Sequence, residues 1–173
     1  IPAKAVFVLP NNSNIILAAT QADVLCDEKD IIVIPTKTIP QGISALVSFD
    51  PTGDADSNKD NMMEAIDCVL SGQVTYAVRD TQIDGHDVKK GDYIAINDEG
   101  LVASETDIKD SVIKMLDGMV SDDYELISIY YGSDVDEADA EAIAAIVEEK
   151  YSYLDVELEY GGQPVYYYII SVE

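Results

Sequence analysis

Short apolar runs alternate with polar loops along the first third of the chain. Residues 4–10 form a mostly apolar, β-branched run that ends at a proline, and residues 31–35 repeat this pattern. Each run is followed by a polar loop, at 11–14 and at 36–40, and then by apolar residues at helical spacing. Continuous apolar runs are typical of strands that are buried on both faces. Two successive strand–loop–helix units therefore predict a parallel sheet with right-handed crossovers.

Three helices are predicted in this part of the chain. The second should begin at Gln41, and the third should cover Asn58–Leu70 and end at Gly72. The first should end near Cys26, and a stripe of this kind is typical of a helix that packs on a core. This stripe consists of Ile15, Leu17, Ala18, Ala22 and Leu25.

The pattern changes at Gln73, where short alternating segments begin. Segments 73–80, 92–97 and 101–103 read as antiparallel strands, and Asp84-Gly85 is a strong hairpin signal. Later segments predict two more helices and three strands, in the order helix, strand, helix, strand, strand: 106–119, 125–131, 133–151, 156–160 and 165–172.

These elements predict an α/β fold with an inserted antiparallel part. Residues 1–72 form parallel-sheet β-loop-α units, 73–105 a β-meander and 106–173 a C-terminal α+β part. The three parts either remain distinct or pack as one compact domain. Ligands of parallel sheets bind at the carboxyl ends of the strands, so the loops at 11–14 and 36–40 are expected side by side at that edge.

Charge excludes two classes of partner. The chain has 34 acidic and 10 basic residues, a formal net charge of −24, and its single arginine is Arg79. Nucleic acid and anionic membranes both need a basic surface, so neither is expected as a partner. No apolar run is long enough to span a bilayer. Cys26 and Cys68 lie in apolar helical patterns and are expected to be buried free thiols of a cytoplasmic protein.

Two motifs that suggest catalysis or metal binding have simpler interpretations. Oxygen-bearing side chains alternate over 54–60 as in a calcium loop, but Lys59 replaces the required glycine and Ala65 the required glutamate. A loop that leads into a helix cap is the better interpretation. His86 lies beside Asp87 in the predicted hairpin, where an exposed turn histidine is favoured over a catalytic base. We therefore predict no catalytic residue and no metal site.

The two polar loops are the strongest candidate site. They carry Asn11, Asn12, Ser13 and Asn14 on one side, and Thr36, Lys37, Gln41 and Gly42 on the other. Amides, hydroxyls and one cation before two helix N-termini could bind a carboxylate or phosphate with help from the helix dipoles. Alternatively, the asparagines and the serine serve only as caps and turn formers.

Five segments carry a resemblance to a known family. They are 9–17 (LPNNSNIIL), 33–43 (VIPTKTIPQGI), 72–80 (GQVTYAVRD), the turn at 90–92 and the ending 161–173. Together they resemble the C-terminal region of the catalytic subunit of bacterial fatty acid kinase. Members of this family are often labelled dihydroxyacetone kinase-like or DAK2-domain proteins. The resemblance covers nearly the whole chain, and its third segment adds Arg79 to the candidate binding residues.

The resemblance implies a DegV-like fold inside a larger enzyme. The parent is expected to be an ATP-dependent fatty acid kinase whose helical kinase domain binds ATP and magnesium through clustered aspartates. The kinase motif, Asp-Gly-Asp-Thr-Gly, does not occur in this chain, so the fragment alone is expected to be no enzyme and to hold no cofactor. The chain begins Ile1-Pro2 and is expected to be a piece of a longer protein. The DegV-like half should lack an opening strand and glycine-rich loop that precede it in the family.

The resemblance implies one function, and the loops leave an alternative open. The domain could dock a separate DegV-like fatty-acid-binding protein that presents its acyl group for acyl phosphate formation and phospholipid synthesis. The parent's kinase domain would be a further partner, and a homodimer is left open. Alternatively, the crevice between Asn14 and Lys37 binds a small molecule or lipid carboxylate directly. A long apolar pocket would favour direct binding, whereas a filled core with polar loops on one face would favour docking.

Overall fold

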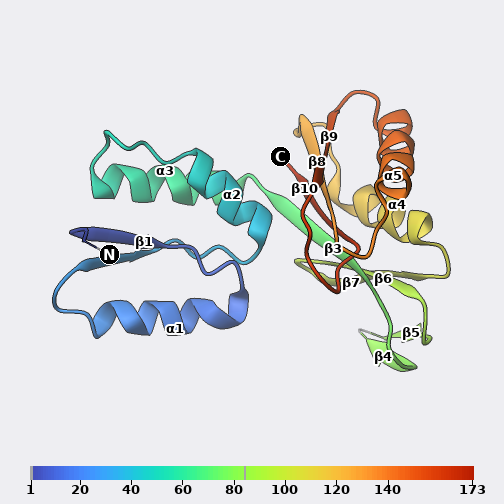
Figure 1. Cartoon of the computed structure of the whole chain (residues 1–173), viewed down its shortest axis with the longest axis horizontal. Coiled ribbons are helices and arrows are strands. Elements are labelled where there is room, and N and C mark those ends of the chain that lie inside the picture. The colour runs from blue at the N-terminus through green and yellow to red at the C-terminus, as the bar shows by residue number, and fades with distance from the viewer. Residues whose placement is uncertain (1, 84) are drawn as a thin grey trace. The chain divides into compact units, whose positions relative to one another are not determined.

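Two units make up the chain, residues 1–69 and 70–173, in a computed structural model that describes residues 2–83 and 85–173. The structure confirms the predicted α/β class (Figure 1). Among the described residues, no helix has both the length and the apolar character needed to cross a membrane.

The first unit is built on a pair of parallel strands. Strand β1 (Ala5–Val8) pairs in register with β2 (Asp30–Val33), and α1 (Ser13–Val24) connects them. Helices α2 (Ile39–Val47) and α3 (Ala55–Asp67) follow and pack on each other. Helix α1 lies on one side of the strand pair, with α2 and α3 on the other (Figure 1). The parallel pairing predicted from the two apolar runs is therefore confirmed.

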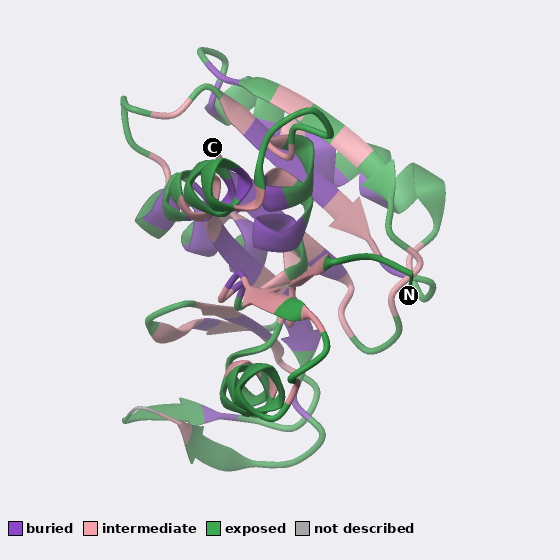
Figure 2. Cartoon of the chain, turned by 90° about the vertical axis from the view of Figure 1, so that its left-hand side faces the viewer, coloured by how far each residue is buried: buried purple, intermediate pink, exposed green. Residues whose placement is uncertain are grey.

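The core of the first unit lies between the sheet and the α2–α3 pair. Its buried members are Ile34, Ala45, Met62 and Ile66, and Phe7 packs edge-on against Phe49 beside them. Helix α1 contributes no buried residue (Figure 2). The predicted stripe of α1 is therefore not in a core. The stripe has the right helical spacing, but the described part of the unit provides nothing to cover it.

The second unit contains a six-stranded sheet in the order β7-β6-β3-β10-β8-β9. The β8–β9 pair is parallel and all other neighbours are antiparallel. The predicted meander is thus continuous with the C-terminal strands. The strands of this sheet are β3 (Leu70–Tyr76), β6 (Tyr93–Asn97), β7 (Gly100–Glu105), β8 (Leu126–Tyr131), β9 (Asp155–Tyr160) and β10 (Tyr168–Val172).

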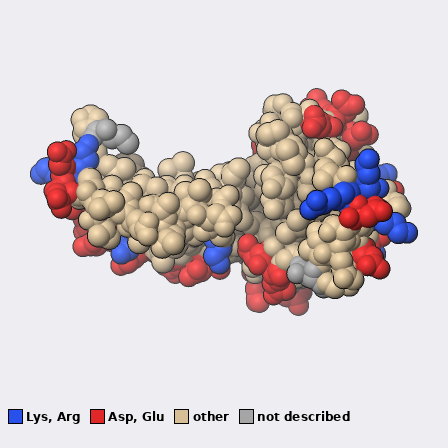
Figure 3. Space-filling model, turned by 90° about the horizontal axis from the view of Figure 1, so that it is seen from below, with Lys and Arg blue, Asp and Glu red and all other residues tan. Residues whose placement is uncertain are grey.

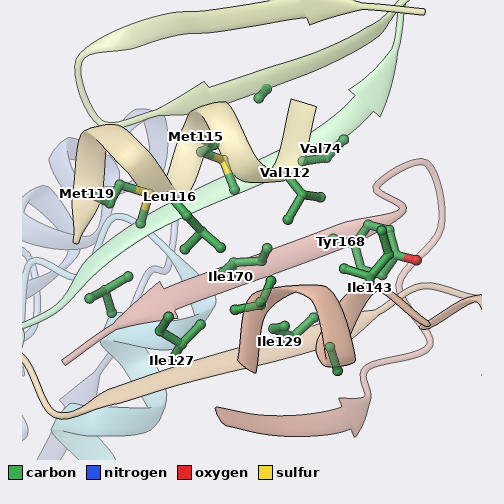
Figure 4. Packing of buried hydrophobic residues seen from close by; sticks show 14 of the residues in the cluster. Val74, Val112, Met115, Leu116, Met119, Ile127, Ile129, Ile143, Tyr168 and Ile170 are labelled. Carbon is green, nitrogen blue, oxygen red and sulfur yellow. The ribbon is translucent and has the colours of Figure 1, made fainter. Parts of the chain in front are cut away.

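Two helices pack on this sheet and close the main core. Helix α4 (Ile108–Met119) contacts β3, β6 and β7, and α5 (Glu137–Lys150) contacts β9. Fully buried side chains fill the space between them (Figure 4). These include Val74, Val112, Met115, Leu116, Ile127, Ile129 and Ile170. Acidic residues in the first turn of α5 and Lys150 in its last turn complement the helix dipole.

Three local predictions are corrected by the structure. Helix α3 ends at Asp67, with Cys68 as its C-cap, so Gly72 does not terminate it. Gly72 instead lies in β3, where a Cβ would come within 3.1 Å of the Met115 side chain; the glycine lets α4 approach the sheet. Cys68 is exposed and Cys26 is half-buried, so the thiols are free but not buried.

Two weaker motifs have the simple roles that were predicted for them. Asp54 is the N-cap of α3, and its side chain accepts a hydrogen bond from Ser57 N. His86 is exposed at the start of β5 (His86–Val88), which pairs with β4 (Thr81–Ile83) in a separate hairpin. Asp84, part of the predicted turn, lies outside the described residues.

Candidate functional site

The two polar loops leave the sheet together at the carboxyl ends of β1 and β2. Val8 pairs with Val33, and Ile34 N donates a hydrogen bond to Val8 O at 3.0 Å. Beyond the sheet, Asn11 N donates to Thr36 Oγ1 at 3.0 Å. The structure thus brings the asparagine loop and the Thr36–Lys37 loop into direct contact, at the edge where the topology placed them.

Asn11 connects these loops to helix α2. Its backbone is in the left-handed region, with φ of 53°, which asparagine tolerates better than most residues. Its side chain lies directly against Gly42, where a Cβ would meet Cγ and Nδ2 of Asn11 at 2.8 Å. The Asn11 Oδ1 atom is buried and accepts no hydrogen bond from the described residues. A buried acceptor of this kind is costly, which makes the Asn11–Gly42 contact a sensitive point of the site.

Both helices that follow the loops begin at this edge and are capped by side chains. Asn12 Oδ1 accepts from Asn14 N at 2.9 Å and caps α1, whose first residue is Ser13. Thr38 Oγ1 caps α2 by accepting from Gln41 N. Thr38 is a site residue that the sequence prediction missed, although the pattern Thr-x-x-Gln is a known capping signature.

Gln41 fixes the second loop from below. The side chain is 8% exposed; its Oε1 accepts from Lys37 N at 2.8 Å and its Nε2 donates to Ile66 O at 3.4 Å. Thr36 is fully buried. Three of the predicted site residues, Thr36, Gln41 and Gly42, therefore form a buried base. The surface above this base carries the exposed side chains of Asn12, Ser13, Asn14 and Lys37.

The electrostatics of this edge contrast with those of the whole chain. The N-termini of two helices, of 12 and 9 residues, open here next to the Lys37 ammonium group. Each N-terminus carries a partial positive charge. This combination attracts a negatively charged or hydrogen-bond-accepting group, in a chain whose net charge is −24. Arg79 is exposed and belongs to the second unit, so it is not among the residues brought together here.

The second unit has a hollow of about 290 Å³ near the start of β10. Tyr93, Tyr167 and Tyr168 line it, and the rings of Tyr93 and Tyr167 meet edge-on at 5.5 Å. Tyr168 is 1% exposed and belongs to the core, which agrees with strand packing as the main role of these tyrosines. Burial, and to a smaller extent Asp139, raises the pKa of Tyr168 to about 12.

The chain belongs to the FakA-like C-terminal family of fatty acid kinases, whose model matches residues 1–173. It is 46% identical over 171 residues to Protein YloV of Bacillus subtilis (strain 168), covering 99% of this chain and 31% of the relative. A Staphylococcus aureus (strain MRSA252) protein, SAR1202, is 41% identical over 170 residues, covering 98% and 31%. The chain thus spans about a third of the length of the curated relatives it matches.

Solved structures confirm the DegV-like fold that the resemblance implied. The Streptococcus pneumoniae fatty acid kinase (Fak) B3 protein, loaded with linoleic acid, matches with a TM-score of 0.67 and 13% identity. The match covers 99% of this chain and 72% of that one. A fatty-acid-binding DegV family protein from Thermus thermophilus matches with a TM-score of 0.64 and 9% identity, over 99% and 72%. At these identities the likeness shows the fold alone.

Proposed function

We propose that this chain is a non-catalytic domain with which a fatty acid kinase docks its acyl-carrying, fatty-acid-binding partner. The partner would be a DegV-like protein, and the docked complex would allow acyl phosphate formation for phospholipid synthesis. ATP and magnesium would bind in the parent's kinase domain. The observation that carries the proposal is the rigid loop edge, where Asn12, Asn14 and Lys37 are exposed above a buried base of Thr36, Gln41 and Gly42.

The packing of the second unit supports docking over enclosure of a lipid. The space between its sheet and helices is filled by side chains such as Met115, Leu116 and Ile170, each fully buried. A C18 fatty acid has a volume similar to or larger than the 290 Å³ hollow beside Tyr168, and that hollow has Lys109, Asp134 and Asp139 in its lining. A surface site for a protein partner agrees better with this arrangement than an internal acyl tunnel does.

Direct binding of a carboxylate is the second candidate, and the two helix N-termini beside Lys37 favour it. In this case the loop edge would bind the anionic group of a free small molecule or lipid. The two candidates predict different ligands for the same residues, so one pair of variants separates them.

The experiment uses the full-length kinase with the acyl-loaded carrier as the varied substrate. We expect Lys37→Ala to raise KM for the carrier about two- to fivefold and to leave kcat unchanged, since one exposed charge contributes up to about 1 kcal/mol. Lys4→Ala is the matched control, because Lys4 is an exposed cation before the opposite end of β1. Equal KM values for Lys37→Ala and wild type would contradict docking at this edge. Loss of binding to a free fatty acid, with carrier KM unchanged, would support the second candidate.

A further inference from the structure

An apolar stripe on α1 is left exposed. It consists of Ile15, Leu17, Ala18, Ala22 and Leu25, which we name the outer stripe, and Val24 flanks it. Leu17 is 68% exposed, Val24 78% and Leu25 84%. Figure 3 views the molecule from the side on which α1 lies, and the surface of the first unit there is mostly uncharged, with charges at its margins.

An apolar face this wide is unusual on a helix exposed to solvent. Helices of globular proteins carry polar residues on the solvent side, and contiguous apolar patches mark surfaces that are covered by something else. Asp23 is the only charged residue of α1. The residues of α1 that face the sheet, such as Ile16 and Ala19, are only half-buried. The sequence of α1 therefore suits a helix covered on both sides.

The sheet beneath α1 is also incomplete. It has two parallel strands, and within the described residues neither outer edge is paired. Parallel sheets are normally larger and covered by helices on both faces, and unpaired strand edges expose backbone donors and acceptors. The exposed outer stripe and the unpaired edges occur in the same unit, which points to one missing layer.

We propose that the segment of the full-length protein before residue 2 covers the outer stripe and adds to the β1–β2 sheet. Strand β1 starts at Ala5, so a preceding segment would enter at this sheet. The chain spans 31% of its relatives' length, and its fold match leaves more than a quarter of the solved structure unmatched. An uncharged face suits an apolar segment of the same chain better than the basic partner that a charge of −24 attracts.

Photo-crosslinking in the full-length protein tests this proposal. A benzophenone side chain placed at Leu17 reacts with whatever lies against it, and mass spectrometry identifies the joined peptide. We expect crosslinks to peptides that precede residue 2. The same group at Tyr153, which is 61% exposed in the second unit, should give few or no such crosslinks. Crosslinks from position 17 to residues 70–173, to a second copy of the chain or to no peptide would overturn the proposal.

Thiol labelling gives an independent result with a smaller perturbation. Leu17→Cys and Leu25→Cys, with Cys26 and Cys68 replaced by alanine, are labelled with a maleimide in the native full-length protein. We expect labelling at least tenfold slower than at Tyr153→Cys, at rates that do not depend on protein concentration. Equal rates at the three positions would show that the outer stripe is exposed. Slow labelling that speeds up on dilution would show that a second copy covers it, and either result would refute the proposal.

Discussion

Replacing Gly42 with alanine tests the central contact of the loop edge. Gly42 lies in α2, and a Cβ there would collide with the Asn11 side chain, with Cγ and Nδ2 at 2.8 Å. Asn11 has little room to move, because its backbone N–H is bonded to Thr36 Oγ1 and its φ is 53°. Gly42→Ala should therefore force the asparagine loop away from α2.

The magnitude follows from two opposing effects. Alanine is favoured over glycine within a helix by about 1 kcal/mol. Overpacking at a tight contact costs about 1–3 kcal/mol. Gly118 in α4 provides the matched control, since a Cβ there would meet nothing within 4 Å. Gly118→Ala should stabilise its helix by up to about 1 kcal/mol, and Gly42→Ala should be less favourable than that by about 1–3 kcal/mol.

Amide hydrogen exchange in the full-length protein measures both changes locally. Peptides covering α2 and α4 report the two helices, and each 1.4 kcal/mol corresponds to a tenfold change in protection. Asn11→Gly removes the obstructing side chain and suits a positive φ, so in that background Gly42→Ala should behave as Gly118→Ala does. If Gly42→Ala raises protection of α2 in the wild-type background, or if Asn11→Gly does not change its effect, the contact is not what the structure indicates.

Two further predictions concern charge and pH. The chain's charge of −24 should steer a basic carrier surface, so the association rate measured by stopped flow should fall between about 50 and 500 mM salt; an unchanged rate would leave the acidic surface without a role in docking. Burial, followed by Asp139, raises the pKa of Tyr168 to about 12. A phenol whose pKa is raised in the folded state loses stability above its unfolded pKa of about 10, here about 2–3 kcal/mol by pH 12. Urea titrations at pH 9 and pH 11.5 should show a smaller alkaline loss for Tyr168→Phe than for wild type, and equal losses would refute the assignment.

The sequence was most informative where one local signal determines the structure. Two apolar runs with polar loops predicted the β1–β2 pair, because a parallel pair needs a long connection and α1 provides it. The loops' positions at the strand ends followed directly. The contact of Asn11 with Gly42 did not follow, since it depends on a left-handed backbone and on the position of α2 relative to the loop.

Predictions failed where tertiary packing decides. Gly72 resembles a helix terminator in sequence, but its small size serves the approach of Met115 to β3. Cys68 follows the apolar pattern of α3 but lies at its C-cap, where the chain turns to solvent. The α1 stripe has the spacing of a core-facing helix, yet periodicity cannot specify what covers a face. Each failure concerns a partner that is distant in the sequence.

The most direct test of the docking proposal is hydrogen exchange of the full-length kinase with and without its acyl-loaded carrier. The proposal predicts slower exchange in peptides covering residues 9–17 and 35–43 when the carrier is added, and no change in the hairpin formed by β4 and β5. Protection should weaken in Lys37→Ala and remain in Lys4→Ala. Carrier binding that protects other segments and leaves both loop peptides unchanged would contradict the proposal.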